Sequence, residues 1–482
     1  MKRRTKIVAT LGPASNQAES IEALITAGVN VFRLNFSHGD ADQHSRQAQQ
    51  IRHLAAQLNT PIGILCDMQG PKVRIGSFGD EDGILLAEND EFRLDSATSP
   101  SAGDIHSVYI ERIYLDDFAV GDRVLFDDGR IAMQIISKTP ESATCRTLTG
   151  GILSSHKGIN KFGDGLSAKA LTDKDRRDIK TAAALGCDYL AISFVRCARD
   201  IEESRTLLSA AGSSAHIIAK IERAEAIDET RLSGIIEAAD GLMVARGDLG
   251  VEIGDANLVA VQKHLIEITN SSNKIVITAT QMMESMIKSP VPSRAEVFDV
   301  ANAVLDGTDA VMLSAEAAVG DYPVETVEAM TRIIEGAEKR PLAQRSIHRI
   351  DEKFQRIDES IAMAAMYVAN HLESIAAIVC MTETGFTPRL MSRINSSIPI
   401  YARAQKPGTC EIITLYKGVS PIYFSSENLQ PNEVNQRAID TLRMSGALTD
   451  GDLVLITNGR ITNIGGHTNS LIIVRVGEKS DA

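Results

Sequence analysis

The chain has 482 residues, and at ~100–200 residues per domain this excludes a single small binding module. Its composition, 44% hydrophobic and 23% charged, is that of a globular protein and argues against a disordered or fibrous one. The net charge of −13 argues against an electrostatic nucleic-acid binder, a basic membrane-surface protein and, taken over the whole chain, anionic substrates.

Other features of the sequence predict a cytoplasmic protein without a membrane partner. No apolar run reaches the ~20 residues needed to cross a bilayer. The six cysteines are far apart and include no CxxC pair, which is typical of reduced, buried thiols rather than of a disulfide framework or a zinc site.

Eight apolar, β-branched runs predict parallel strands buried on both faces. They are residues 6–10, 29–36, 62–67, 189–194, 217–221, 241–245, 275–280 and 310–315. Their starts are 23–35 residues apart, except for a gap of 127 residues after the third run. Eight βα units of ~30 residues predict a TIM (β/α)8 barrel that is interrupted after strand 3.

Local signals between these runs predict helices. One apolar face carries Ile21, Leu24 and Ile25, and another carries residues 51, 54, 55 and 58. A polar residue followed by an acid three positions later predicts a helix start at three places: Asn16 with Glu19, Thr172 with Asp175, and Ser293 with Glu296. Glycines at the expected helix ends are Gly28, Gly186 and Gly307.

The long gap predicts an inserted β domain, and a further α/β block follows the barrel. Asp128-Gly129 predicts a tight two-residue hairpin turn, and alternation at 131–137 and 143–148 continues the β pattern. On a barrel loop such a domain would be a small β-barrel lid. The C-terminal block predicts a doubly wound domain with a helix at 359–372 and strands at 376–381, 398–402, 421–424, 452–457 and 471–476. The expected domains are residues 1–70 and 169–341 (barrel), 71–168 (lid) and 342–482 (C-terminal α/β domain).

Chemistry in a TIM barrel occurs at the carboxyl ends of the strands. Lys220 and Glu222 are two residues apart, so both side chains should leave strand 5 on the same face. Glu222 and Asp248, on neighbouring strands, could hold Mg²⁺ together with substrate oxygens. The alternatives are solvated acids or a pairing of these acids with Arg246.

A cationic set at the same end comprises Arg33, Arg74 and Lys220, which could hold a phosphate and stabilise a transferring phosphoryl group. The alternative is a structural ion-pair network of these cations with Asp67, Glu222 and Asp248. Gly247 and Gly250 should leave backbone N–H groups free for an anion. Thr280 alone is a weak catalytic candidate, and the sequence contains neither a P-loop nor a kinase H-R-D motif.

These residues lie within stretches that closely resemble the pyruvate kinase family over essentially the whole chain. The matching stretches are residues 5–15 (TKIVATLGPAS), 29–39 (VNVFRLNFSHG), 219–225 (AKIERAE), 244–253 (VARGDLGVEI), 278–286 (TATQMMESM) and 312–316 (MLSAE). The resemblance implies transfer of the phosphoryl group of phosphoenolpyruvate to ADP, giving pyruvate and ATP, as the final step of glycolysis.

The resemblance also implies a role for individual residues. Lys220, Arg33 and Thr280 would be catalytic, with Gly247 and Asp248 also in the substrate site, and Glu222 and Asp248 would hold Mg²⁺ or Mn²⁺. The nucleotide-binding positions would be Asn35, His38, Arg74 and Lys174. A homotetramer is the family's usual state and is expected here.

One departure concerns the monovalent cation. Asn35, Ser37, Asp67 and the Met68 carbonyl match the K⁺ ligands of the family, but Lys72 stands in place of an acidic residue. A fixed ammonium group there would replace K⁺ electrostatically, so we expect an enzyme that does not require K⁺. The alternative is that Lys72 points to solvent at the lid hinge.

A second feature is a turn rich in hydroxyl groups in the C-terminal domain. Its residues Thr382, Thr384, Gly385 and Thr387 match a loop that binds an activator's phosphate in the family. Lys406, Arg403 and the 458–460 loop could assist. Together with Lys72, this loop resembles the bacterial class activated by AMP or sugar monophosphates. An ordinary capped turn is the alternative.

Two competing functions use the same residues differently. A metal-dependent aldolase would cleave a carbon–carbon bond through a pyruvate enolate and would release pyruvate without ADP. A catalytically silent sensor would bind sugar phosphates through the C-terminal domain, but it would need a broken site, and Lys220, Glu222, Asp248 and Thr280 are all present.

Overall fold

The computed structural model describes residues 3–79, 83–163, 165–340, 353–425, 429–459 and 468–478. Its centre is a closed barrel of eight parallel strands in the order β1-β16-β15-β14-β13-β12-β3-β2. The strands are β1 (Lys6–Thr10), β2 (Val31–Asn35), β3 (Gly63–Asp67), β12 (Tyr189–Ile192), β13 (His216–Ile221), β14 (Gly241–Ala245), β15 (Ile275–Ala279) and β16 (Ala310–Leu313). All eight predicted strands are therefore confirmed.

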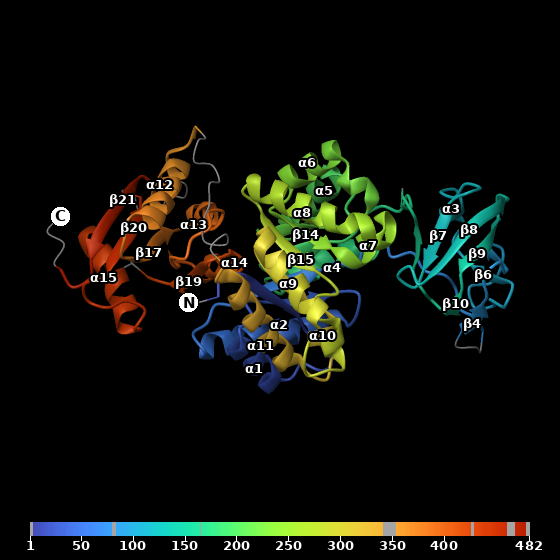
Figure 1. Cartoon of the computed structure of the whole chain (residues 1–482), viewed down its shortest axis with the longest axis horizontal. Helices are drawn as coiled ribbons and strands as arrows, with labels where there is room; N and C mark the ends of the chain where they lie inside the picture. The colour runs from blue at the N-terminus through green and yellow to red at the C-terminus, as the bar shows by residue number, and fades with distance from the viewer. Residues whose placement is uncertain are drawn as a thin grey trace.

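Helices surround the barrel and bury their apolar faces against it (Figure 1). They are α1 (Ala18–Ala27), α2 (Ala41–Gln57), α4 (Asp173–Ala184), α5 (Ala198–Ala210), α6 (Glu229–Ala238), α7 (Arg246–Ile253), α8 (Asp255–Ser271), α9 (Arg294–Asp306), α10 (Ala315–Ala318) and α11 (Pro323–Glu338), with 3₁₀ turns η1 (Ala224–Ile227) and η2 (Glu284–Ile287). No helix in the described part of the chain is long and apolar enough to cross a membrane.

The predicted helix signals are mostly confirmed. Thr172 with Asp175 and Ser293 with Glu296 form reciprocal capping boxes on α4 and α9. The prediction for Asn16 and Glu19 is wrong, because Gln17 is the N-cap of α1 and makes no side-chain cap bond. Instead, the Asn16 amide oxygen accepts a hydrogen bond from the Gln17 side chain.

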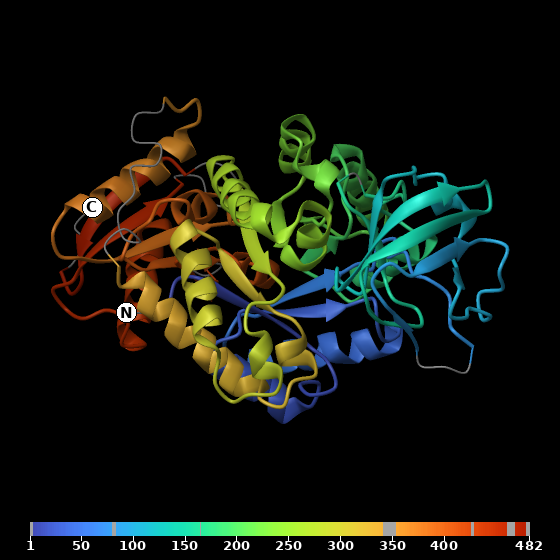
Figure 2. The same cartoon turned by 45° about the vertical axis from the view of Figure 1, so that its right-hand side comes forward.

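The β insert extends from the carboxyl side of the barrel, opposite the C-terminal unit (Figure 2). A six-stranded sheet has the order β11-β7-β8-β9-β5-β6, and a two-stranded sheet pairs β10 with β4 around the same apolar core. The elements are β4 (Gly83–Leu86), β5 (Glu91–Asp95), β6 (Ser107–Tyr109), α3 (Arg112–Leu115), β7 (Arg123–Phe126), β8 (Ile131–Lys138), β9 (Ser142–Thr149), β10 (Gly151–Ser154) and β11 (Ile159–Lys161).

The predicted hairpin around Asp128-Gly129 joins β7 to β8, but its turn is longer than expected. Phe126 pairs with Ile131, so residues 127–130 form a four-residue loop. Asp127, Asp128 and Gly129 all adopt positive φ. The Asp-Gly signal therefore located the chain reversal, whereas the cross-strand register set the loop length.

The C-terminal unit is a five-stranded sheet in the order β19-β18-β17-β20-β21, with β21 antiparallel to β20. Alternate residues of β17 face two separate apolar cores: Ile378 and Cys380 pack with α12 and α13, and Ala377 and Val379 pack with α15. The elements are α12 (Ile357–His371), β17 (Ile375–Thr382), α13 (Phe386–Ser392), β18 (Ile400–Ala404), α14 (Pro407–Ile413), β19 (Val419–Tyr423), α15 (Pro431–Met444), β20 (Leu453–Asn458) and β21 (Ser470–Arg475).

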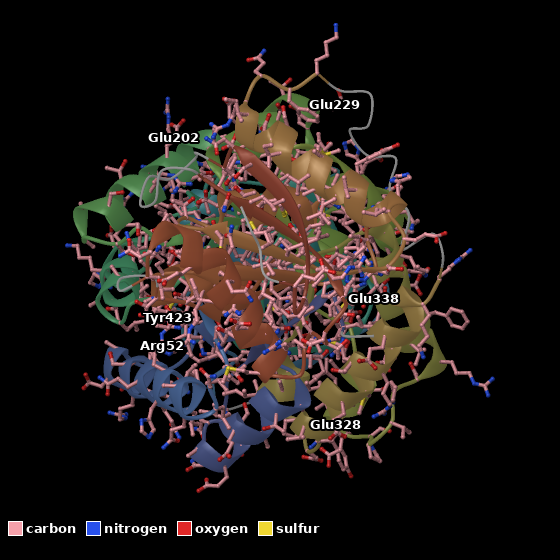
Figure 3. The ribbon with its side chains drawn as sticks, turned by 90° about the vertical axis from the view of Figure 1, so that its left-hand side faces the viewer. Arg52, Glu202, Glu229, Glu328, Glu338 and Tyr423 are labelled. Atoms are coloured by element: carbon pink, nitrogen blue, oxygen red, sulfur yellow. The ribbon has the colours of Figure 1, made fainter. Side chains whose placement is uncertain are left out.

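The C-terminal unit packs on the amino-terminal end of the barrel strands, so it leaves their carboxyl ends open. The Asp309 carboxylate at the start of β16 pairs with Arg393, and both side chains are only 1% exposed. Removing one member of such a buried pair typically costs about 3–5 kcal/mol. Figure 3 views the molecule from this side and labels Arg52, which pairs across the junction with Glu411 at 3.2 Å. It also labels Glu338, which accepts a hydrogen bond from the Thr5 hydroxyl at 2.8 Å within the barrel unit.

Candidate active site

Lys220 leaves the carboxyl end of β13 with all three ammonium donors engaged. Its Nζ lies 3.2 Å from Asp67 Oδ1 and 2.9 Å from Glu222 Oε1, and it donates to the Ser193 hydroxyl at 2.7 Å. Burial favours the neutral amine, but the charges of Asp67 and Glu222 outweigh it and raise the pKa of Lys220. The site therefore holds a fixed positive charge at the mouth of the barrel.

Asp67, at the end of β3, joins Lys220 to Arg33 on β2. Arg33 Nε lies 2.7 Å from Asp67 Oδ2, and Arg33 Nη1 donates to the Thr10 hydroxyl at 3.1 Å. Burial alone would raise the pKa of Asp67, yet Lys220 and Arg33 together lower it. We call Arg33, Asp67, Lys220 and Glu222 the buried half of the site.

The sequence left open a structural ion-pair network of the cations with Asp67, Glu222 and Asp248 in place of a phosphate site. The pairs of Asp67 with Arg33 and of Lys220 with Asp67 and Glu222 belong to that network. Their presence does not remove a phosphate-binding role. Both cations reach the carboxyl end of the barrel, and Arg33 is half-buried rather than enclosed. The two cations and the two carboxylates of this half balance in charge, so an anionic group beside Arg33 and Lys220 would depend on further positive charge, such as a metal ion, at the same mouth.

The carboxylates of Glu222 and Asp248 fit a divalent cation. Glu222 is 2% exposed and its Oε2 accepts from the Phe194 N–H at 2.6 Å, whereas Asp248 lies in the first turn of α7. Burial raises the pKa of Glu222, Lys220 opposes this rise, and the negative charge of Asp248 adds to it. A divalent cation between them would relieve this repulsion. The described residues contain no group of three or more metal-ligating side chains, so substrate oxygens and water would complete the shell.

Thr280 follows β15 in a strained turn. Thr280 and Gln281 adopt φ of 69° and 53°, a conformation that costs a non-glycine residue about 1–3 kcal/mol. Arg246 donates to the Thr280 carbonyl from Nη2 at 2.6 Å, and its Nη1 bonds both oxygens of Asp299 at 2.8 and 2.7 Å. The alternative pairing of Arg246 with Glu222 or Asp248 is therefore wrong.

The two glycines beside Asp248 do not offer the free N–H groups that the sequence predicted. The Gly247 N–H donates to the Thr280 hydroxyl at 2.8 Å. Gly250 is the fifth residue of α7, where the N–H bonds to the carbonyl four residues earlier. Gly247 instead joins the Asp248 turn to the Thr280 turn.

Of the predicted nucleotide residues, Asn35 pairs with Asp67 in the barrel ladder, and the other three are more exposed than the buried half. His38 and Arg74 are exposed, and Arg74 Nη1 donates to the His156 carbonyl of the lid at 2.9 Å. Lys174 donates to the Phe36 carbonyl at 2.6 Å and pairs with Asp178 at 2.5 Å. We call His38, Arg74 and Lys174 the open half of the site. The predicted cationic set is thus divided: Arg33 and Lys220 lie at the mouth of the barrel, whereas Arg74 lies in the lid range 71–168 and bonds to His156 within it.

Hydrogen bonds connect only some of the groups expected at the monovalent-cation site. The Ser193 hydroxyl lies 2.8 Å from the Met68 carbonyl and 3.5 Å from Asp67 Oδ1. The Asn35 side-chain oxygen accepts from the Ser37 N–H at 3.2 Å. Lys72 Nζ lies 3.4 Å from Asp248 Oδ1.

Lys72 therefore faces the Asp248 carboxylate across the lid hinge. The alternative that it simply points to solvent is not what the structure shows. A small hollow beside the pair is lined by Lys72, Asp248, Phe194, Arg223 and Glu252.

The predicted effector residues surround the start of α13. Gly385 is its N-cap with φ 79°, and its N–H donates to the Thr382 hydroxyl at 2.9 Å. Thr384 is exposed, whereas Thr387 is buried and bonds to the Thr468 hydroxyl at 2.8 Å. The buried Arg403 guanidinium donates to the Ala438 carbonyl, and Arg460 lies outside the described residues.

Sequence reasoning missed Ser193, Thr10 and Asp299. Ser193 is the last residue but one of the predicted strand 189–194, so its position near a strand end was a usable signal. Thr10 ends β1 in the same way. Asp299 lies on α9, 53 residues after Arg246, and no local pattern marks it as that residue's partner.

Comparison with known proteins gives matches along the whole chain. Residues 2–327 match the family model described as "Pyruvate kinase, barrel domain", and residues 359–474 match "Pyruvate kinase, alpha/beta domain". The chain is 52% identical over 476 residues to the pyruvate kinase of Buchnera aphidicola subsp. Acyrthosiphon pisum, covering 98% of this chain and 99% of the relative. It is 49% identical over 476 residues to pyruvate kinase II of Salmonella typhimurium, with the same coverage.

The fold has a close match among solved structures. A crystal structure of a pyruvate kinase from Cryptosporidium parvum superposes with a TM-score of 0.91 at 34% identity, covering 98% of this chain and 96% of that one. The similarity therefore includes the barrel, the inserted β unit and the C-terminal sheet together.

Proposed function

Because the chain belongs to the pyruvate kinase family and is a phosphotransferase, we propose how its residues divide the transfer of a phosphoryl group from phosphoenolpyruvate to ADP. The observation that carries the proposal is the Lys220 ammonium, held between Asp67 and Glu222 at the mouth of the barrel. Phosphoryl transfer depends on positioning and on charge stabilisation. Lys220 and Arg33 supply both on the phosphoenolpyruvate side.

Glu222 and Asp248 would hold Mg²⁺ or Mn²⁺. The bound ion would supply charge neutralisation for the substrate oxygens. The support from this chain is the mutual repulsion of two carboxylates, one of them buried. Lys220, already paired with Glu222, keeps that carboxylate oriented toward the substrate.

Thr280 is proposed to act where the enolate left after transfer takes up a proton. Its hydroxyl accepts from the Gly247 N–H and donates to the Ala279 carbonyl at 2.7 Å, so its orientation is fixed. Asp248, the carboxylate proposed to hold the metal, lies two residues after Arg246 on α7. Thr280 is thus tied to the segment that carries the substrate side of the site.

Asn35, His38, Arg74 and Lys174 are proposed to bind the nucleotide. The exposure of His38 and Arg74 leaves them accessible to a mobile substrate. The bond from Arg74 to His156 supports a role for the lid, because any movement of the lid carries this guanidinium with it. ADP would then meet phosphoenolpyruvate between lid and barrel.

We propose that the reaction does not require K⁺. The Lys72 ammonium lies 3.4 Å from the Asp248 carboxylate, which is proposed to hold the divalent metal. There it would add a permanent positive charge beside the substrate anions. The other groups expected at this monovalent-cation site are Asn35, Ser37, Asp67 and the Met68 carbonyl.

Regulation and assembly are proposed from two further surfaces. The turn at Thr382, Thr384, Gly385 and Thr387 would take the phosphate of a sugar-phosphate or AMP activator. Activity measured with each candidate compound tests this.

A homotetramer is supported by an apolar groove between α9 and α11, lined by Val297, Ala301, Ala329 and Ile333, and by Phe298 beside it, which is 71% exposed. Analytical ultracentrifugation of the full chain measures the assembly. Free thiols at all six cysteines support a cytoplasmic location.

The test of function is a coupled assay of the purified chain with phosphoenolpyruvate, ADP and Mg²⁺. Pyruvate and ATP should form in equal amounts, at the same rate in Na⁺ and in K⁺, and chelation of the divalent ion should stop the reaction. Absence of ATP formation would reject the assignment of the site. A large stimulation by K⁺ would reject the role given to Lys72.

A further inference from the structure

The turn after β15 places two consecutive non-glycine residues in the left-handed region, and one arginine satisfies its carbonyls. Arg246 donates to the Thr280 carbonyl from both Nε (3.1 Å) and Nη2 (2.6 Å), and Nη2 also donates to the Gln281 carbonyl at 3.0 Å. Both carbonyls come after Ala279, the last residue of β15, so they are outside the hydrogen-bonded ladder of that strand. Without Arg246 both carbonyls would lose these bonds, in a turn where Thr280 is half-buried and Gln281 is exposed.

Asp299 fixes the guanidinium in the orientation that this bonding requires. Its two oxygens bond Arg246 Nη1, while Nε and Nη2 face the turn. The Arg246 side chain is 8% exposed, and Asp299 is 35% exposed on the outer helix α9. The planar Arg246 guanidinium bonds the Asp299 carboxylate on one side and the carbonyls of Thr280 and Gln281 on the other, and this holds the turn in one orientation.

The same turn is joined to the metal-binding segment by a second bond. The Gly247 N–H donates to the Thr280 hydroxyl, and Gly247 lies between Arg246 and Asp248. Arg246 therefore contacts the Thr280 turn through its side chain, and its neighbour contacts the same residue through the backbone. Two bonds, one from a side chain and one from the backbone, thus join Thr280 to the segment that carries Asp248.

We propose that Arg246 and Asp299 are positioning residues that hold Thr280 in place for protonation of the enolate. The inference rests on the role proposed above for Thr280. Neither residue needs to touch substrate. Asp299 acts through Arg246, and Arg246 acts through the Thr280 turn.

The step that these residues should affect has a direct readout. After the phosphoryl group has left, a proton adds to C3 of the enolate, the carbon–carbon double bond electrons form the new C–H bond, and the enolate oxygen becomes the ketone of pyruvate. By microscopic reversibility, the enzyme also removes a methyl proton from pyruvate. In D₂O this appears as deuterium in the methyl group.

The experiment uses the full chain with Asp299→Asn and, separately, Arg246→Lys, which keeps the charge but loses the fork. Deuterium uptake by pyruvate with ATP and Mg²⁺ is followed by NMR, beside ATP formation from phosphoenolpyruvate and ADP. We expect methyl exchange to fall about tenfold or more, with ATP formation falling less than about threefold. Asp306→Asn, on the same helix and paired with Lys263, is the control and should change neither rate.

Two outcomes would overturn the inference: unchanged methyl exchange in Asp299→Asn, or equal loss of exchange and ATP formation together with a lowered melting temperature. Thr280→Val separates this inference from the proposed function. If that variant exchanges normally, the role of Thr280 itself is wrong. If it loses exchange while Asp299→Asn does not, only the positioning by Asp299 and Arg246 is wrong.

Discussion

The buried half and the open half of the site differ in how far the fold itself satisfies their charges. Lys220 has three partners from three different strand ends, and Asp67 holds both Lys220 and Arg33. Arg74, by contrast, is exposed and bonds to a backbone carbonyl, and Lys174 has one carbonyl and one carboxylate as partners.

This difference indicates a division of labour. Groups fixed before substrate arrives need little reorganisation in the transition state, which is where preorganised charge is most effective. The open half can instead be completed by the nucleotide and by the lid. The following changes test that division, from the largest expected effect to the smallest.

Lys220→Met should have the largest effect. It removes the ammonium charge that we propose stabilises the transferring group, and it leaves Asp67 and Glu222 without their shared partner. We expect kcat to fall about 10³-fold, measured in the coupled assay. Lys288→Met, which removes a lysine 76% exposed on the surface, should leave kcat unchanged. A comparable loss in both variants would argue against a specific role for Lys220.

Glu222→Gln should weaken the metal site next. Glu222 loses a charge facing Asp248, so the Mg²⁺ concentration that gives half-maximal activity should rise about 10–100-fold. Activity at saturating Mg²⁺ should recover in part. An unchanged Mg²⁺ requirement would show that this carboxylate does not hold the ion. The control is Glu225→Gln, whose side chain pairs with Arg223 and Arg231.

Arg74→Met should affect the open half alone. We expect the KM for ADP to rise about tenfold, which corresponds to ~1.4 kcal/mol, with the KM for phosphoenolpyruvate unchanged. Initial rates at varied ADP and varied phosphoenolpyruvate separate the two effects. A rise in both constants would mean that the two halves are coupled.

Lys72→Glu should produce the smallest change in maximal rate but a new ion dependence. The substitution replaces a positive charge 3.4 Å from Asp248 with a negative one, so a monovalent cation should become favourable there. We expect the variant to be several-fold faster in K⁺ than in Na⁺. Lys157→Glu, which alters a lysine paired with Asp127 on the lid, should show no such ratio.

The sequence was sufficient to predict the barrel and the position of its chemistry. Buried parallel strands appear as unbroken apolar runs, and the barrel brings their carboxyl ends together, so Arg33, Asp67, Lys220 and Glu222 could be placed at one mouth. Their actual pairings, with Asp67 shared by both cations, depend on side-chain directions that periodicity does not specify.

Long-range partners were beyond the reach of local patterns. Asp299 and Ser193 bond to residues 53 and 27 positions away in the chain, respectively. The left-handed turn at Thr280 is imposed by tertiary contacts, since neither threonine nor glutamine favours it. The whole-chain charge of −13 was also the wrong scale for judging anionic substrates, because the cations gather locally.

The most direct test of the two-half account is calorimetric titration of phosphoenolpyruvate with Mg²⁺ and without nucleotide, into the native chain and into Arg74→Met. If the buried half is complete without the open half, the two Kd values should agree within about twofold. A Kd at least about tenfold weaker in Arg74→Met would show that phosphoenolpyruvate already depends on this arginine of the lid, and would contradict the account.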